Sequence, residues 1–125
     1  MLLGIGIDHC EVRRMQRQLD PPANGFLTSI FRPAEIAYCS AKHRPAEHFA
    51  ARFAAKEAAL KALAAAGGTG SFWLDMEIIN EPDGRPRLEL DGRLGELAHG
   101  LGVRTIHVSL THTADMAAAV VVVED

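Results

Sequence analysis

Hydrophobic and polar positions alternate at the start of the chain, which predicts a β-strand over residues 1–8. Leu3, Ile5 and Ile7 point to one face, while the two glycines between them and Asp8 point to the other. Glycines within a strand indicate that a backbone or a ligand comes close to them. The alternative is a hydrophobic edge strand whose terminal carboxylate faces solvent.

Residues 46–66 have the composition of a long α-helix, because Ala, Leu, Lys and Glu dominate them. At about 100° per residue, the large apolar side chains form one stripe, which we expect to face the core. The stripe comprises Phe49, Phe53, Leu60 and Leu63, and it also contains Lys56.

Glu57 and Lys61 lie beside each other on the flank of this stripe, above the small side chains of Ala50 and Ala54. A surface helix usually carries its charges opposite its apolar face. An acid and a base at the edge of the buried side therefore predict the wall of a pocket. The alternative is an ordinary i,i+4 ion pair, which contributes about 0.2–0.5 kcal/mol.

The remaining patterns mix helices and strands. Further helices are expected over residues 10–19, 33–42 and 94–101, and strands over 72–80, 87–90, 106–111 and 117–123. The last strand is apolar throughout, which predicts burial on both faces. Because the elements follow no regular βαβ order, the sequence predicts an α+β fold, with a mostly antiparallel sheet packed against one long central helix and shorter helices.

The chain has 125 residues, of which 48% are hydrophobic and 23% charged, so we expect a single domain over residues 1–125. The net charge of −3 argues against nucleic acid as a partner, and the longest apolar run, residues 116–123, is too short to span a membrane. Two cysteines without metal spacing and an N-terminus without signal-peptide character predict a cytoplasmic protein. His43 and His48 have no partner at metal spacing and are expected on the surface.

Arg13, Arg14 and Arg17 concentrate positive charge on the helix expected at residues 10–19. A local basic patch can bind an acidic protein even when the whole chain is acidic. The three arginines are therefore a candidate docking surface, and a solvated helix face is the alternative.

Two carboxylates, Asp8 and Glu57, stand where the pattern predicts open space beside the backbone. If the fold brings them together, their oxygens suit Mg²⁺, which takes one or two protein carboxylates together with waters and substrate phosphates. Lys61, one helical turn after Glu57, would face the same phosphates as a point charge. Such a set is typical of catalysis of attack at phosphorus.

Four motifs follow one another along nearly the whole chain, from Met1 to about Glu124. They are Gly4-Ile5-Gly6-Ile7-Asp8, the run from Arg52 to Ala62, Asp75-Met76-Glu77-Ile78 with Asp83-Gly84-Arg85-Pro86, and the run from His107 to Thr113 before Ala117. In this order they resemble the small bacterial holo-[acyl-carrier-protein] synthases, which are 4'-phosphopantetheinyl transferases.

The resemblance implies that the protein transfers the 4'-phosphopantetheine arm of coenzyme A to a serine of apo acyl carrier protein and releases 3',5'-ADP. It implies Mg²⁺ held by Asp8 and Glu57, with Lys61 near the phosphates and His112 near coenzyme A. The proton of the serine would pass either to a metal-bound water or to Glu57.

The resemblance also implies a mode of assembly. Arg13, Arg14 and Arg17 would dock the acidic carrier protein. Three identical chains would form a homotrimer with active sites between subunits, so that Asp8 and Glu57 need not meet within one chain.

Two features depart from the pattern of the family. The glycines at Gly67 to Gly70 come later than in many relatives, and Arg32 stands where relatives place a helix-capping Ser or Thr, three residues before Glu35. Loss of such a cap typically costs about 1 kcal/mol. The altered glycine loop favours one alternative, a non-catalytic module that binds coenzyme A or the carrier protein. A Mg²⁺-dependent phosphotransferase acting on a nucleotide is another.

Overall fold

The computed structural model describes residues 1–19, 25–65 and 72–125 of the chain. It begins with β1 (Leu2–Glu11), which runs directly into α1 (Val12–Leu19). The other elements, in order, are α2 (Phe26–Ile30), α3 (Pro33–Ser40), α4 (Pro45–Ala62), the 3₁₀ turn η1 (Trp73–Asp75), β2 (Met76–Asn80), β3 (Pro86–Leu90), α5 (Gly92–Gly100), β4 (Thr105–His112) and β5 (Met116–Glu124).

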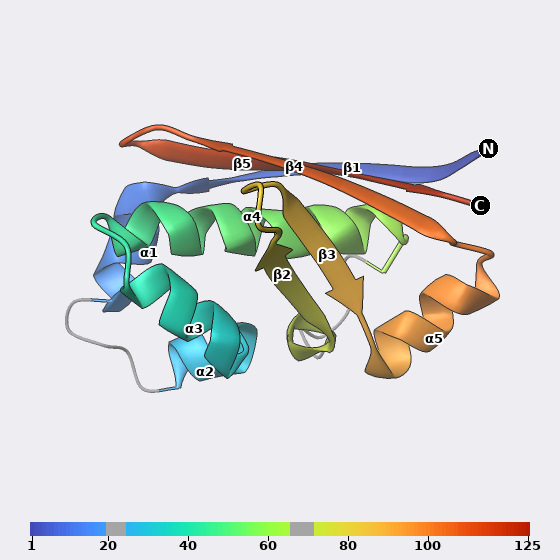
Figure 1. Ribbon diagram of the computed structural model, residues 1–125, viewed down its shortest axis with the longest axis horizontal. Coiled ribbons are helices and arrows are strands. Elements are labelled where there is room, and N and C mark those ends of the chain that lie inside the picture. The colour runs from blue at the N-terminus through green and yellow to red at the C-terminus, as the bar shows by residue number, and fades with distance from the viewer. Residues whose placement is uncertain (20–24, 66–71) are drawn as a thin grey trace.

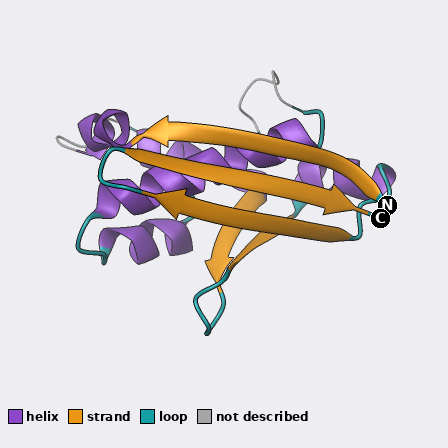
Figure 2. Cartoon of the chain, turned by 90° about the horizontal axis from the view of Figure 1, so that it is seen from above, coloured by secondary structure: helices purple, strands orange, loops and turns teal. Residues whose placement is uncertain are grey.

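The main layer is an antiparallel three-stranded sheet in the order β1-β5-β4. Helix α4 runs along the inner face of this sheet, with α1 to α3 gathered at one end and α5 at the other (Figure 1). The hairpin of β2 and β3 forms a second, two-stranded sheet that projects from beneath the first (Figure 2). The predicted α+β fold with a long central helix is therefore confirmed, although the strand expected from residue 72 begins only at Met76.

The alternation in β1 is confirmed, and the structure identifies what approaches the glycines. Gly4 and Gly6 lie directly on the backbone of α4, where a Cβ atom would overlap the carbonyl oxygens of Ala62 and Ala58 respectively. The alanines of α4 add little bulk on their own side and are fully or nearly fully buried. Strand and helix thus approach more closely than larger residues would allow.

The opposite face of β1 is apolar and uncovered. The exposed fraction is 65% for Ile5 and 67% for Ile7, whereas isoleucine is more often found inside a protein. These residues pair with Val122 and Val120 of β5, whose side chains are only partly buried. The prediction that the last strand is buried on both faces is therefore wrong for a single chain, because α4 covers only the inner face.

Lys56 lies in the core, as its position in the apolar stripe of α4 indicates, and it is fully buried. Its Nζ donates to Oε1 of Glu35 at 2.7 Å, to the carbonyl oxygen of Ile30 at 2.7 Å and to that of Trp73 at 3.0 Å. Glu35 is 1% exposed and also accepts a hydrogen bond from the backbone N–H of Ile78 at 3.0 Å. This buried pair therefore ties α2, α3, η1 and β2 to α4.

At the start of α3, the backbone N–H of Arg32 donates to Oε1 of Glu35 at 2.9 Å. This is the half of a capping box that the acid three residues after the cap supplies, and it does not replace the bond that a Ser or Thr would accept. The guanidinium binds the carbonyl oxygen of Leu74 at 2.8 Å and the carboxylates of Asp91 at 2.6 Å and Glu77 at 3.4 Å. The side chain is thus already engaged within the chain. Within the described part of the chain, no helix has the length and apolar character needed to cross a membrane.

Candidate active site

Three of the predicted site residues meet where β1 passes over the second half of α4. Asp8 occupies the next inward-facing position of β1 after Gly6, and Gly6 contacts the backbone of α4 at Ala58. Lys61 Nζ donates to the carbonyl oxygen of Ile7 at 2.9 Å and to Oδ1 of Asp8 at 3.3 Å. The close approach that the glycines permit therefore brings the strand carboxylate to the lysine of the helix.

Glu57 belongs to the same group. Burial raises the pKa of its carboxyl group, and the negative charge of Asp8 raises that pKa further. Lys61, one turn away on α4, lowers it by a smaller amount. The charge of Asp8 thus acts on Glu57 within one chain, although the resemblance does not require the two carboxylates to meet there.

The two acids suit a hard divalent cation. No group of three or more His, Cys, Asp and Glu side chains in the described segments could form a metal cage. Two neighbouring carboxylates with a half-exposed lysine beside them fit Mg²⁺ instead, because Mg²⁺ retains several waters and uses few protein ligands. Burial first, and then the negative charge of Asp8, raise the pKa of Glu57, and a cation held by both carboxylates would offset the repulsion between them.

The predicted arginine surface divides between two cavities on either side of α1. Arg14 lines a cavity of about 190 Å³ together with Met15, Phe26 and Phe53, and this cavity also contacts His9, the residue after Asp8. Its wall combines this apolar group with the cation Arg14, the acid Glu11 and the amide of Gln18, and it reaches the strand residue that follows Asp8.

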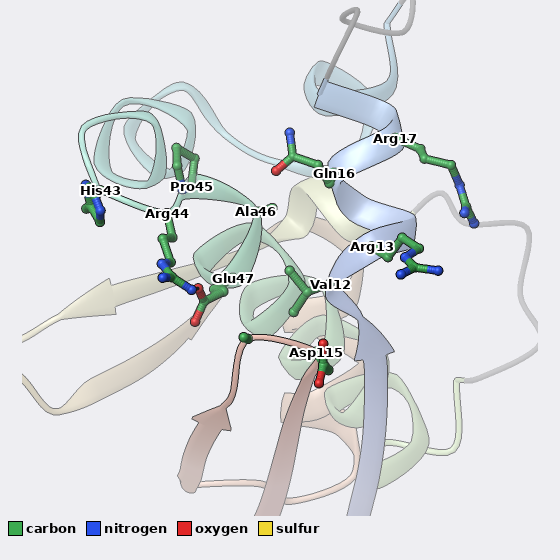
Figure 3. Close-up of a pocket in the computed structure, with 11 residues that line it drawn as sticks. Val12, Arg13, Gln16, Arg17, His43, Arg44, Pro45, Ala46, Glu47 and Asp115 are labelled. Atoms are coloured by element: carbon green, nitrogen blue, oxygen red, sulfur yellow. The ribbon is translucent and has the colours of Figure 1, made fainter.

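Arg13 and Arg17 border a larger cavity of about 510 Å³ between α1, the start of α4 and the turn from β4 to β5. Arg44 and Glu47 line its other side and point toward one another (Figure 3). The three arginines are all exposed, and positions 13, 14 and 17 lie within about 100° of one another around α1.

His112 lies at the other end of α4 from the carboxylate pair. Its Nδ1 is 3.0 Å from Oε1 of Glu47 in the first turn of α4. Glu57 follows Glu47 by ten residues, or about 15 Å along the helix axis. A single chain therefore keeps His112 apart from Asp8, Glu57 and Lys61.

The family model described as the 4'-phosphopantetheinyl transferase superfamily matches residues 4–121. The chain belongs to this superfamily. The transferase is 46% identical to a holo-[acyl-carrier-protein] synthase of Koribacter versatilis, over 100% of both chains. Among solved structures, the chain is similar to the Helicobacter pylori holo-[acyl-carrier-protein] synthase in complex with coenzyme A, with a TM-score of 0.82 and 32% identity. The match covers 96% of this chain and 99% of that chain.

A synthase from Bacillus anthracis in complex with coenzyme A (3',5'-ADP) matches the transferase with a TM-score of 0.79 and 32% identity, covering 98% of this chain and 96% of that one. The resemblance inferred from the four motifs is thus confirmed. Gly67 to Gly70, the departure from the family pattern, lies outside the residues that the structure describes.

Sequence reasoning missed two residues around His112. Glu47 lies in the first turn of a helix, where the helix dipole favours an acid in any protein. Its position in the sequence therefore gave no sign of a functional role. His48 was expected on the surface like the exposed His43, but its ring is half-buried, with its centroid 5.2 Å from that of His112. The pairing of β4 with β5 places His112 at the start of α4. Without that pairing, neither Glu47 nor His48 could be recognised as a neighbour of His112.

Proposed function

We propose that this transferase moves the 4'-phosphopantetheine arm of coenzyme A to a serine of an apo acyl carrier protein. The observation that carries the proposal is the meeting of Asp8, Glu57 and Lys61 between β1 and α4, in a chain of this superfamily. A bond forms between the serine Oγ and the β-phosphorus of coenzyme A, and the bond from that phosphorus to 3',5'-ADP breaks. The serine gives up its proton, and 3',5'-ADP leaves.

Each residue of this group has a role of its own. Asp8 and Glu57 would hold Mg²⁺, and the bound ion would neutralise negative charge on the diphosphate of coenzyme A. Lys61 carries a positive charge that stabilises the negative charge developing on the leaving group. Burial and the negative charge of Asp8 raise the pKa of Glu57 in the metal-free chain, and a cation held by this carboxylate would lower that pKa again. The serine proton would therefore pass either to Glu57 or to a water held by the cation.

The active sites of this transferase lie between the subunits of a homotrimer. His112 matches the histidine that lies near coenzyme A in the family, yet one chain holds it about 15 Å along α4 from the carboxylate pair. The uncovered apolar face around Ile5 and Ile7 gives a second reason for assembly, since isolated chains rarely leave such side chains in water. Packing of these faces would let His112 of one chain serve the carboxylates of another.

The cavity beside α1 receives the carrier protein. Arg14 attracts the acidic carrier, and Met15, Phe26 and Phe53 offer an apolar surface next to His9, adjacent to Asp8. Arg13 and Arg17 extend the positive field along the same helix. Both cysteines are free thiols, which fits a reducing, cytoplasmic location.

Two sets of variants test these assignments. Asp8→Ala and Glu57→Ala should each abolish release of 3',5'-ADP, while Glu96→Ala, at an exposed acid on α5, should leave it unchanged. Arg14→Glu should raise the KM for the carrier and leave the KM for coenzyme A as it is. Retained turnover in both carboxylate variants would refute the assignment of Asp8 and Glu57 as ligands of Mg²⁺.

Co-expression tests the shared site directly. Glu57→Ala and His112→Ala chains, each defective alone, should regain part of the activity when they assemble together, because some sites then combine an intact Glu57 with an intact His112. If both residues act within one chain, mixing restores nothing. Native mass spectrometry of the parent protein should give the mass of three chains.

A further inference from the structure

Glu47 is a carboxylate in a wall where cations predominate. It lines the larger cavity with Arg13, Arg17 and Arg44 and with a second acid, Asp115, and its exposed fraction is only 9%. A negative charge in such a wall weakens the attraction of an anionic ligand, so Glu47 is not there to bind such a ligand by its charge. What the carboxylate touches offers a different explanation.

Both oxygens of Glu47 are directed at neighbouring groups of the site. Oε1 is 3.0 Å from Nδ1 of His112, and Oε2 is 3.6 Å from Nη1 of Arg44. The imidazole of His112 is about a third exposed, at 35%, so the ring has one side toward protein and one toward solvent. A carboxylate beside Nδ1 accepts a hydrogen bond from Nδ1–H. This favours the form of the ring in which Nδ1 carries the proton, and it leaves Nε2 as the nitrogen available to a ligand.

Tilted and edge-on ring contacts also surround His112 on the side of His48. The ring of His48 lies 5.2 Å from that of His112 and 6.3 Å from that of Tyr38, between centroids. Burial lowers the pKa of His48, and the neighbouring His112 lowers it further, which favours the neutral form of this ring in its aromatic contacts. The His112 imidazole is thereby fixed in both rotation and plane.

We propose that Glu47 is a positioning residue that fixes the His112 imidazole with Nε2 directed outward, so that His112 can contact bound coenzyme A. The contact between His112 and coenzyme A rests on the proposed function, whereas the contact between Glu47 and His112 does not. Glu47 itself touches no substrate. The hydrogen-bonding oxygen matters, and the negative charge does not.

Nitrogen-15 NMR of the imidazoles tests the contact without any activity. We expect Nδ1 of His112 to carry a proton in the parent protein and in Glu47→Gln, whose amide oxygen still accepts. In Glu47→Leu the His112 signals should shift toward the tautomer with the proton on Nε2, and Glu96→Leu on α5 serves as the matched control. An unchanged His112 spectrum in Glu47→Leu overturns the proposal.

Steady-state kinetics tests the consequence. Glu47→Leu should raise the KM for coenzyme A about tenfold, the cost of losing one hydrogen bond to a group that can be charged, and should leave the KM for the carrier protein unchanged. Glu47→Gln should restore a KM near that of the parent. His112→Ala should raise the KM as much, and adding Glu47→Leu to it should raise it no further.

Other results would contradict this role. A lower KM in both Glu47 variants would mean that the carboxylate only repels the ligand, and additive effects with His112→Ala would mean that it acts independently. A lower melting temperature with an unchanged KM would reduce Glu47 to a structural residue. Absence of transfer by the parent protein would refute the proposed function alone, and the NMR result would still decide the contact.

Discussion

The close contact of β1 with α4 is the feature on which the candidate site most depends, and Gly6→Ala disturbs it at one atom. The added Cβ would overlap the carbonyl oxygen of Ala58 and would lie 2.8 Å from the backbone nitrogen of Ala62. Both are backbone atoms, so no side chain can rotate away. Strand and helix must instead separate, by a distance on the order of 1 Å.

This separation has two measurable consequences. Overpacking of a close contact typically costs about 1–3 kcal/mol of unfolding free energy. Asp8 is two residues beyond Gly6 and moves with the strand, away from Lys61 and Glu57 on the helix. Because a misplacement of about 1 Å in a catalytic group can cost about 100-fold in rate, we expect turnover to fall by that order.

The assay pairs urea unfolding with the rate of 3',5'-ADP release at saturating coenzyme A and Mg²⁺. Gly100→Ala is the control, because nothing lies within 4 Å of a Cβ at that position of α5. It should leave both quantities as they are or raise stability slightly. If Gly6→Ala kept parental stability and rate, the argument that this contact builds the site would be refuted.

Three further predictions concern the groups around the site. Lys56→Met leaves the carboxylate of Glu35 buried without its partner and should lower the unfolding free energy by about 3–5 kcal/mol, part of which the added change Glu35→Gln should recover, as urea titration will measure. Because the folded-state pKa of Glu57 is raised, its ionisation costs stability above that pKa. Metal-free Glu57→Gln should therefore melt at a higher temperature than the parent at pH 8, and the difference should vanish as the pH falls through the raised pKa and below 4.5. Trp73 is the only tryptophan, and its indole lies close enough to Glu57 to lower the pKa of that carboxyl group, although its Nε1 has no hydrogen-bond partner. Mn²⁺ should therefore quench the Trp73 fluorescence in the parent and far less in Glu57→Gln, and equal quenching in both would contradict a metal site at Glu57.

Much of the fold could be predicted because its patterns are local. The alternation of β1 and the apolar stripe of α4 follow from the periods of strand and helix. The placement of Lys56 in the core also followed from that stripe. The sequence could not indicate that Glu35, 21 residues earlier, supplies its buried partner, because that pairing depends on how α3 packs on α4.

Other features depend on contacts that no local pattern contains. The glycines of β1 predict a close neighbour, but only the fold identifies it as α4 and thereby brings Asp8 to Lys61. Glu47 carries no signal of its own until the pairing of β4 and β5 delivers His112. The apolar outer face of the sheet was wrongly predicted to be buried, because an apolar run does not reveal that α4 covers only the inner face.

The most direct test of the central claim is the intact mass of an apo acyl carrier protein incubated with this transferase, coenzyme A and Mg²⁺. We predict a gain equal to one phosphopantetheine arm, absent when EDTA replaces Mg²⁺ and absent with Asp8→Ala. A carrier of unchanged mass with the parent protein, across several carriers and despite measurable binding of coenzyme A, would contradict the claim and leave a module that binds without catalysing.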